Sequence, residues 1–391
     1  MVLGSGLLAA FELQTLPEQL VNGLQYGAVY ALMALGYTMV YGVLRLINFA
    51  HGEIYMLGAY TALFVSWAFG FSPAQELGTQ TNVWIIIAML AASMAVSALF
   101  GVIIERFAYR PMRSQPRIAA LITAIGVSLL LQYGGQLFLP NSPAPNVSQR
   151  VNPFPGAYSF TLKAADPELT AKAESQQQEL KRLEGLWTAQ QIKEKDTYNP
   201  SPEGKAIRDA FFNTRATYDK AVADARATAI TVGISKGYVI IFVVTLVLMA
   251  ALRHLVLFTK AGRAMRAVSH DFDSASLMGI NVNKIVTLTF VIGSSLAGAA
   301  AMLSATFQAG IKIDTFFGLL PGVKAFVAAV LGGIGNIPGA VLGGFLMGLT
   351  ETMVVWGGGS DYKDAVAFVI LILVLLVRPG GLLGSAKVEK V

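Results

Sequence analysis

The sequence contains no cysteine and only three histidines, His51, His254 and His270. The lack of cysteine excludes disulfides, thiolate metal sites and cysteine nucleophiles, and so few histidines give no reason to expect a metal site. Charge is scarce too: Asp, Glu, Lys and Arg make up 13% of the 391 residues, about half the share in an ordinary soluble protein. The chain therefore does not have the composition of a soluble globular domain.

Signatures of catalysis are missing as well. There is no G-x-x-x-x-G-K-[ST] run, which forms the phosphate loop of many ATPases, and no G-x-S-x-G or H-E-x-x-H sequence. We therefore expect that this chain is not an enzyme, that it has no catalytic residue, and that it binds neither a metal nor a cofactor. If it moves a solute uphill, a partner supplies the energy.

The residues that are abundant indicate a membrane protein. Hydrophobic residues make up 54% of the chain, the mean hydropathy is +0.58, and there are 39 glycines, which are frequent in transmembrane helices. A spanning helix needs about 20 mostly apolar residues. We predict an all-α polytopic transmembrane bundle of about eight spans, some discontinuous, at 20–43, 54–70, 83–104, 118–139, 233–253, 285–307, 319–356 and 362–378.

The positive charge of the chain, +6 in total, lies mostly beside these spans. Short loops rich in Lys and Arg stay in the cytoplasm. Residues 105–117 hold Arg106, Arg110, Arg113 and Arg117, and residues 253–268 hold four further basic residues. We place both loops in the cytoplasm and the loop 71–82, which has no Lys or Arg, outside. The charge is thus explained without a nucleic-acid partner.

The chain divides into three parts by composition. We expect an N-terminal transmembrane half (1–139), a soluble helical insert on the periplasmic side (140–232), and a C-terminal transmembrane half (233–391) that includes a cytoplasmic loop at 259–284. The insert begins with a Pro- and Asn-rich linker and continues as two polar, mixed-charge stretches around a Pro-containing break. That pattern predicts an αα-hairpin.

The stretch INFAHGEIYMLGAY, residues 47–60, places Asn48, His51, Gly52 and Glu53 between two apolar runs. An ionisable side chain in a bilayer costs several kcal/mol. These residues therefore belong either to a plain loop or to a helix that is broken at membrane depth and lines a pathway.

A second interrupted stretch lies at 324–349. Six of the eight positions 332–339 are helix breakers: Gly332, Gly333, Gly335, Asn336, Pro338 and Gly339. A single glycine would more often indicate close helix packing, but two interrupted apolar segments in different halves are typical of a transport pathway. We expect Gly332, Gly333, Gly335 and Asn336 to offer exposed backbone to a solute.

The loop 259–285 contains a short amphipathic stretch in which Ala264, Ala267 and Val268 fall on one helical face. Such a helix can dock into a groove on a partner. The alternative is an ordinary basic loop.

Four stretches strongly resemble the permease subunits of bacterial branched-chain amino acid (leucine/isoleucine/valine) ABC importers: NGLQYGAVYALMALGYTMVYGVLRLINFAHGEIYMLGAY, RAMRAVSHDFDSASLMGINVNKIVTLTFVIG, VKAFVAAVLGGIGNIPGAVLGG and DYKDAVAFVILILVLLVRPGGLLG. The resemblance covers nearly all of the chain outside 140–232, where similar family members carry a shorter loop. It implies a multi-pass protein of the bacterial inner membrane that contacts lipid.

The resemblance also implies partners: a second permease subunit, two cytoplasmic ATPase subunits that bind ATP, and a periplasmic substrate-binding protein. The segments 47–60 and 331–343 would line the path between the permeases. The segment 262–279 would be the coupling helix, with Gly262, Arg263, Arg266, Asp271 and Gly279 as candidates for the ATPase contact.

Three alternatives remain. A permease for urea or short-chain amides shares much of this pattern. A passive channel would use the broken helices as a filter. A membrane-embedded enzyme is disfavoured because the spans show no paired carboxylates, metal ligands or nucleophile–base spacing.

Overall fold

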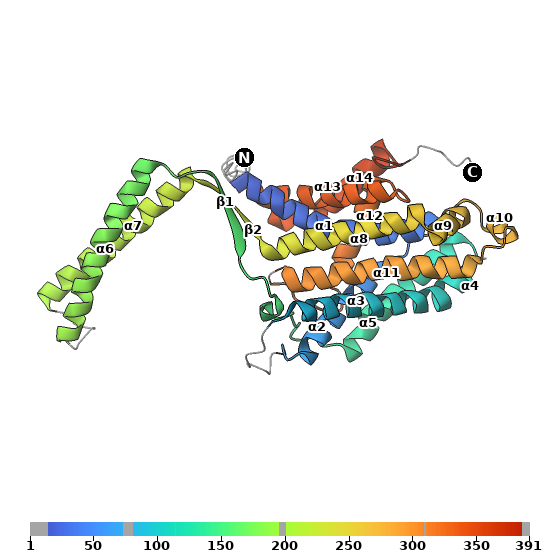
Figure 1. The fold of residues 1–391 in the computed structure, drawn as a ribbon, viewed down its shortest axis with the longest axis horizontal. Helices are drawn as coiled ribbons and strands as arrows, with labels where there is room; N and C mark the ends of the chain where they lie inside the picture. The colour runs from blue at the N-terminus through green and yellow to red at the C-terminus, as the bar shows by residue number, and fades with distance from the viewer. Residues whose placement is uncertain (1–14, 73–80, 114, 195–200, 309, 385–391) are drawn as a thin grey trace, which may run out of the picture. The chain divides into compact units, whose positions relative to one another are not determined.

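The structure is a computed structural model that describes residues 15–72, 81–113, 115–194, 201–308 and 310–384 (Figure 1). The middle of the predicted outer loop 71–82 lies outside the described residues. Within the described residues, six helices are long and apolar enough to cross a membrane. They are α1 (Leu16–Leu44), α3 (Val83–Ile104, continued to Met112), α5 (Arg117–Phe138), α8 (Lys236–Phe258), α11 (Val282–Phe307) and α13 (Ile337–Trp356).

The remaining apolar helices are shorter: α2 (His51–Ala68), α12 (Leu319–Gly332) and α14 (Lys363–Val377). The predicted all-α polytopic fold is confirmed. Each predicted apolar segment forms a helix because, in a lipid environment, a helix satisfies every backbone N–H and C=O within its own segment.

The segment 319–356 differs from the prediction of one interrupted span. It is two helices, α12 and α13, that reverse direction between residues 333 and 336. A Cβ on Gly332 would lie 1.9 Å from the carbonyl oxygen of Gly339, and a Cβ on Gly343 would lie 2.0 Å from that of Ala328. Glycine at these positions lets the two helices pack backbone to backbone, and the breakers form the tight turn between them.

The centre of the helical bundle is the packing of α11 against α2 and α3. Ser93 and Ser97 of α3 donate hydrogen bonds to the carbonyl oxygens of Gly58 (2.9 Å) and Ile54 (3.2 Å) in α2. Gly58 in turn lies against Gly298 of α11. Small residues and interhelical hydroxyl bonds are typical of helix association in membranes, and they hold α2 in a fixed position.

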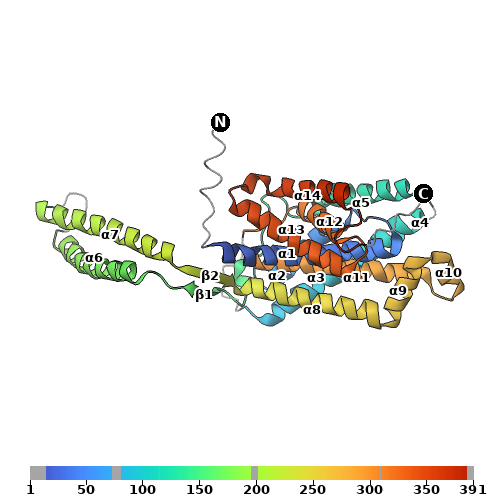
Figure 2. The same ribbon diagram turned by 90° about the horizontal axis from the view of Figure 1, so that it is seen from above.

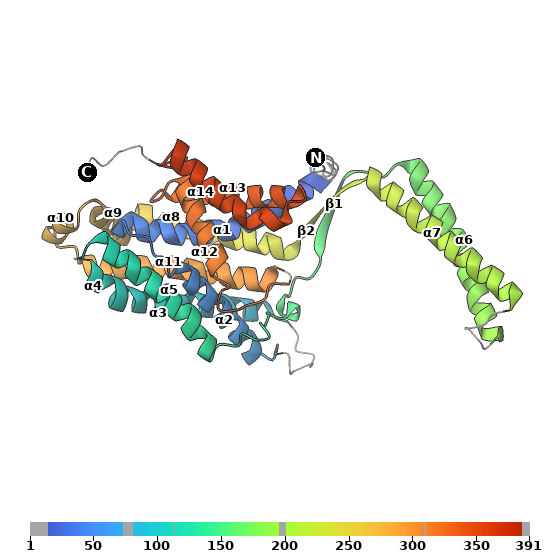
Figure 3. The same cartoon turned by 180° about the vertical axis from the view of Figure 1, so that it is seen from behind.

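One end of the bundle carries short helices. It is formed by α4 (Arg110–Met112), α9 (Lys260–His270) and α10 (Phe272–Leu277), which lie together in Figures 1 and 3. Both basic loops that the sequence places in the cytoplasm therefore lie at the same end. Between α3 and α4 the chain forms one π-helical turn, η2 (Glu105–Tyr109).

A second compact unit is formed mainly by Tyr158–Ile234. It contains β1 (Ala157–Lys163) and β2 (Ile230–Ser235), which pair as a two-stranded sheet. It also contains α6 (Pro167–Glu194) and α7 (Pro202–Thr228), which pack side by side (Figure 2). The two helices match the predicted helical pair, whereas the strands were not predicted. The residues 195–200 between the helices lie outside the described residues. The described residues also form 3-10 turns at η3 (Gln149–Val151) and η4 (Ser360–Tyr362).

Candidate functional site

The helix α2 begins inside the bundle. A Cβ built on Gly36 of α1 would lie 2.4 Å from Nε2 of His51 and 2.8 Å from the carbonyl oxygen of Gly293, so these three residues are adjacent. Gly293 lies about 16 Å along α11 from its first residue, near the middle of that 26-residue helix. The first turn of α2 is therefore at mid-depth in the bundle, which favours the broken helix over the plain end loop.

The three polar side chains at this break are buried. Asn48, His51 and Glu53 are each no more than 2% exposed. Oδ1 of Asn48 accepts a hydrogen bond from the Tyr109 hydroxyl at 3.0 Å, and Glu53 accepts one from Nε2 of Gln132. The sequence analysis identified neither donor, because each lies on a different helix far along the chain.

Each of the three side chains also has a polar atom without a hydrogen-bond partner in the described part of the chain: Asn48 Nδ2, His51 Nε2 and Glu53 Oε2. The His51 ring packs edge-on against Tyr37, with 4.5 Å between ring centroids. Buried polar atoms are normally paired, so unpaired ones call for an explanation. Three of them within residues 48–53 mark this break as a place that can exchange contacts with a polar solute or water.

Glycines bring a second helix to the same point. A Cβ on Gly52 would lie 2.5 Å from the carbonyl oxygen of Gly318, and one on Gly322 would lie 2.9 Å from the Cα of Gly52. The first turn of α2 therefore meets the start of α12. Gly332–Asn336 lie at the other end of α12, about 15 Å along the helix from Gly322, where Gly335 lies against Gly42 of α1. The structure thus does not bring together the two sets of residues predicted to line the path.

The backbone at the second break is largely occupied. The N–H groups of Leu382 and Leu383 donate to the carbonyl oxygens of Leu331 (2.8 Å) and Gly332 (3.0 Å). The Asn336 side chain accepts from the N–H of Gly339 and donates to the carbonyl of Leu383. The expectation of open backbone is thus wrong for Gly332, because residues after α14 fold back over the turn. Gly333 also has both backbone groups bonded, its N–H to Ala329 and Val330 and its carbonyl to Asn336.

A charge cluster around the buried Lys324 joins α12, α13 and α14. Nζ of Lys324 in α12 lies 2.6 Å from a carboxylate oxygen of Glu351 and 2.6 Å from one of Asp364, and the Tyr30 hydroxyl donates to Glu351 at 2.7 Å. The statement that the spans hold no paired carboxylates is therefore wrong. In the sequence, the feature that could have indicated this cluster was Lys324 within an apolar run. Opposite charges brought together in this way stabilise one another where water is excluded.

The short helices α9 and α10, at the end that holds the basic loops, have both buried and exposed residues. On α9 the buried residues are Gly262, Met265 and Val268. Of the predicted apolar face, Val268 is therefore buried within this chain, whereas Ala267 is exposed. Gly262 packs against the last carbonyl groups of α8. Arg266 donates to the carbonyl oxygen of Val256 at that same end, as basic residues near helix C-termini do. Arg263 is exposed.

The next helix, α10, is fixed at both ends. Oδ1 of Asp271 accepts a hydrogen bond from the N–H of Ser274 at 2.7 Å and caps the helix. This hydrogen bond holds the pKa of Asp271 below its ordinary value. Gly279 has φ of +81°, a left-handed conformation that glycine adopts readily after a helix. Between these ends, Leu277 and Met278 are 88% and 83% exposed, and the sequence analysis had not singled them out.

Among the described residues, no three His, Asp or Glu side chains come together as metal ligands. The polar groups in the bundle are therefore candidates for contacts with a solute or for helix packing.

Comparison with known proteins gives matches along almost the whole chain. Residues 19–375 match the family described as the permease component of branched-chain amino acid transport systems. The chain is 38% identical to the high-affinity branched-chain amino acid transport system permease protein BraD of Pseudomonas aeruginosa, over 96% of this chain and 97% of that protein. It is 34% identical to the corresponding protein LivH of Escherichia coli K12, with the same coverage. An autoinducer 2 import system permease, LsrC of an Enterobacter species, is 32% identical over 30% of this chain and 36% of that protein. No solved structure matches the chain.

Proposed function

This chain belongs to the family of branched-chain amino acid transport system permease components, and we propose that it carries branched-chain or related hydrophobic amino acids as one permease subunit of an ATP-driven importer. The observation that carries the proposal is a family match along almost the whole chain, combined with helices that fit a multi-pass membrane protein. The substrate follows from the names of the relatives at 38% and 34% identity.

In this proposal the path passes the start of α2. A zwitterionic amino acid in a bilayer needs polar partners for its ammonium and carboxylate groups. The unpaired atoms of Asn48, His51 and Glu53 supply such partners at mid-depth, while Gly52 brings the start of α12 to the same point. At the second break, Gly332–Asn336, it is Gly335 that is proposed to line the path, because Gly335 is exposed.

Energy comes from partners in this proposal. The chain itself is not an enzyme and binds no cofactor, two ATPase subunits dock on the cytoplasmic side, and a periplasmic protein delivers the amino acid. The ATPase contact is made by the end that carries α9 and α10. Arg263, Leu277 and Met278 are exposed there and suit a groove that accepts a short helix. Gly262, Arg266, Asp271 and Gly279 act by fixing the shape of this segment.

The importer has two permease subunits, this chain and a related one, in the bacterial inner membrane. Alternating access then requires that the substrate bind the outward-open and inward-open states with different affinity, because equal affinity shifts no equilibrium. Binding and hydrolysis of ATP in the partner subunits drive the exchange between these states.

The test is uptake by the complex purified from native membranes and reconstituted in liposomes with ATP inside. We expect accumulation of leucine, isoleucine and valine only with ATP and the binding protein, and no accumulation of urea. Glu53→Gln and His51→Ala should each reduce uptake. Ser66→Ala is the matched control, because the Ser66 hydroxyl bonds to Leu63 within α2. Equal uptake by all three variants would exclude the assigned path, and conduction without ATP would favour a channel.

The ATPase contact has a separate test. Leu277→Glu places a charge on the exposed apolar pair, and we expect it to reduce the amount of ATPase that co-purifies with the permease. Phe212→Glu is the control, since Phe212 is also an exposed apolar residue (54%) but lies in α7 of the second unit. If both variants retained the ATPase equally, the assigned contact would be wrong.

A further inference from the structure

The π-helical turn η2 carries two buried side chains that face different parts of the bundle. Glu105 is 0% exposed and Tyr109 is 1% exposed. A π-helical turn inside an α-helix is rare and is often found at a functional site. Here the turn lies between α3 and α4, at the end of the bundle that carries α9 and α10 (Figure 1).

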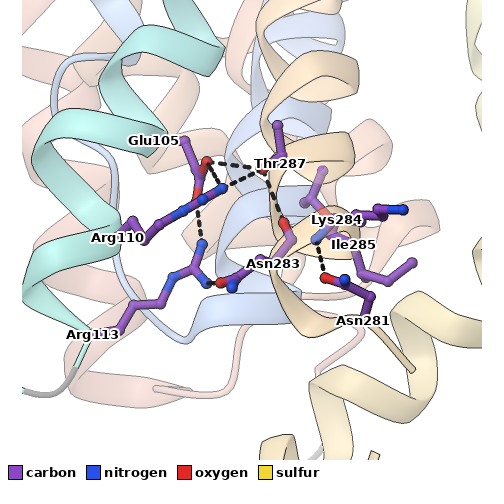
Figure 4. A network of polar contacts seen from close by, with 9 residues as sticks. Glu105, Arg110, Arg113, Asn281, Asn283, Lys284, Ile285 and Thr287 are labelled. Atoms are coloured by element: carbon purple, nitrogen blue, oxygen red, sulfur yellow. Dashed lines mark hydrogen bonds and ion pairs between the residues drawn. The ribbon is translucent and has the colours of Figure 1, made fainter. Parts of the chain in front are cut away.

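Glu105 binds the first turns of α11. Figure 4 shows Arg110, Arg113 and Thr287 converging on its carboxylate. Arg110 donates through Nε (3.2 Å) and Nη2 (3.0 Å), and the Thr287 hydroxyl lies 2.9 Å from Oε2. Arg113 makes an ion pair with the same carboxylate. Arg110 and Arg113 directly follow η2, so their ion pairs hold Glu105 in place, since charged hydrogen bonds are about twice as strong as neutral ones. The link to α11 is the Thr287 hydroxyl, which also accepts from Nη2 of Arg110 at 3.1 Å.

The same network reaches the segment proposed to contact the ATPase. Nη1 of Arg113 donates to Oδ1 of Asn283 at 2.7 Å, and Asn281 caps α11 by accepting from the N–H of Lys284. Residues 278–281 connect α10 directly to α11 and include this cap. The first turns of α11 thus carry both the cap that follows α10 and the contacts with Arg113 and Glu105 (Figure 4).

Tyr109 binds the other functional segment. Its hydroxyl lies 3.0 Å from Oδ1 of Asn48 and 3.4 Å from the carbonyl oxygen of Ile47. Its ring packs against Phe290 of α11, with 5.3 Å between the ring centroids. Asn48 lies three residues before His51, the first residue of α2, and Glu53 follows in the first turn of that helix. One turn of helix thus contacts both the start of α11 and the entry to α2.

We propose that Glu105 and Tyr109 are positioning residues that couple the ATPase-contacting segment to the start of α2. The proposal rests on the proposed function, since it assumes that α9 and α10 receive motion from an ATPase. Motion of α10 displaces the first turns of α11. The Glu105 network passes this displacement to η2, and the Tyr109 hydroxyl passes it to Asn48 at the path.

The test uses conservative variants in the reconstituted complex. Tyr109→Phe removes the hydroxyl and keeps the ring, and Thr287→Val removes one contact with Glu105 at constant size. We expect each to lower the amount of amino acid transported per ATP hydrolysed by about threefold to tenfold, the scale of one lost hydrogen bond to a buried group. For Thr287→Val the substrate concentration for half-maximal uptake should stay the same, because Thr287 touches neither the substrate nor a residue assigned to substrate contact.

Two controls separate coupling from folding. Thr289→Val removes a hydroxyl on the same helix that bonds to Ile285 within α11 (2.9 Å), and Tyr133→Phe changes a tyrosine on α5. Both should transport normally per ATP. The double variant Tyr109→Phe/Thr287→Val should lose less than the product of the two single effects, because the two bonds lie on one connection.

The outcomes are distinct. If the unmodified complex does not accumulate branched-chain amino acids, the proposed function fails. If it does, but Tyr109→Phe and Thr287→Val match their controls in transport per ATP, the coupling role is refuted while the proposed function stands. The same refutation follows if both variants lose thermal stability and complex yield without a change in that ratio, because this is the result expected of a purely structural role.

Discussion

The closest helix contact in the candidate site gives a sharp test of the structure. Gly52→Ala adds a Cβ 2.5 Å from the carbonyl oxygen of Gly318, whereas ordinary van der Waals contact begins near 3.4 Å. The next neighbours are the carbonyl carbon of Gly318 at 3.2 Å and the Cα of Gly322 at 3.4 Å. All of these neighbours are backbone atoms, so there is no flexible side chain that can move aside. Either α2 or the start of α12 must shift.

Overpacking of this kind typically costs about 1–3 kcal/mol. For a chain longer than 150 residues, 1 kcal/mol lowers the unfolding midpoint by about 2 °C, so we expect a decrease of about 2–6 °C. The assay is thermal unfolding of the detergent-purified protein, followed by tryptophan fluorescence. Uptake should decrease in parallel, because the shift moves Glu53 relative to Gln132.

Gly126→Ala is the matched control. Gly126 lies in the membrane helix α5, and a Cβ built there meets nothing within 4 Å. Alanine is the better helix former, by about 0.5–1 kcal/mol, so this variant should be at least as stable as the parent. If Gly52→Ala were as stable as Gly126→Ala and retained full uptake, α2 and α12 would not meet as described, and the placement of the candidate site would be refuted.

Two further predictions follow from the charged groups. Lys324→Met leaves Glu351 without its cation and should destabilise the purified protein by about 3–5 kcal/mol. Asp364→Asn should cost less than about 1 kcal/mol, because the Asp364 side chain is 38% exposed. Equal unfolding midpoints for the two variants would contradict the cluster. Asp271→Ala should weaken stimulation of the ATPase, whereas Asp271→Asn should preserve it, because asparagine also caps helices. Since the pKa of Asp271 is lowered in the folded protein, its capping contribution is complete above the unfolded value of about 3.9 and is lost only as the pH falls through the lower folded value. ATPase stimulation should therefore show no titration of this group between about pH 5 and 8, and a decrease there that Asp271→Asn removes would contradict the capping role.

Much of the helical architecture follows from local pattern. The apolar segments predicted at 83–104 and 285–307 match α3 and α11 within a few residues, because hydropathy and length identify a spanning helix without reference to its neighbours. The polar, mixed-charge stretches of the insert likewise form α6 and α7. The strands β1 and β2 were not predicted, because a short two-stranded sheet leaves a weak signal in the sequence.

The residues of the candidate site were predicted less completely than the helices. Asn48, His51 and Glu53 were identified because polar groups are rare between apolar runs. Their partners Tyr109 and Gln132 were not, since neither is unusual in its own helix. The same applies to the carboxylates of Glu351 and Asp364, which become a cluster with Lys324 only when α12, α13 and α14 pack together.

By itself, the sequence determined that this is an all-α membrane protein, where its apolar helices lie, and which family it resembles, because each of these properties depends on local composition or on stretches of consecutive residues. Tertiary structure alone decided that the start of α2 meets Gly318 and Gly322 and not Gly332–Asn336. It also decided that the residues after α14 cover the turn between α12 and α13. These contacts join residues far apart in the chain, and they depend on which glycines let two backbones approach, a property of the packed pair of helices and not of either segment alone.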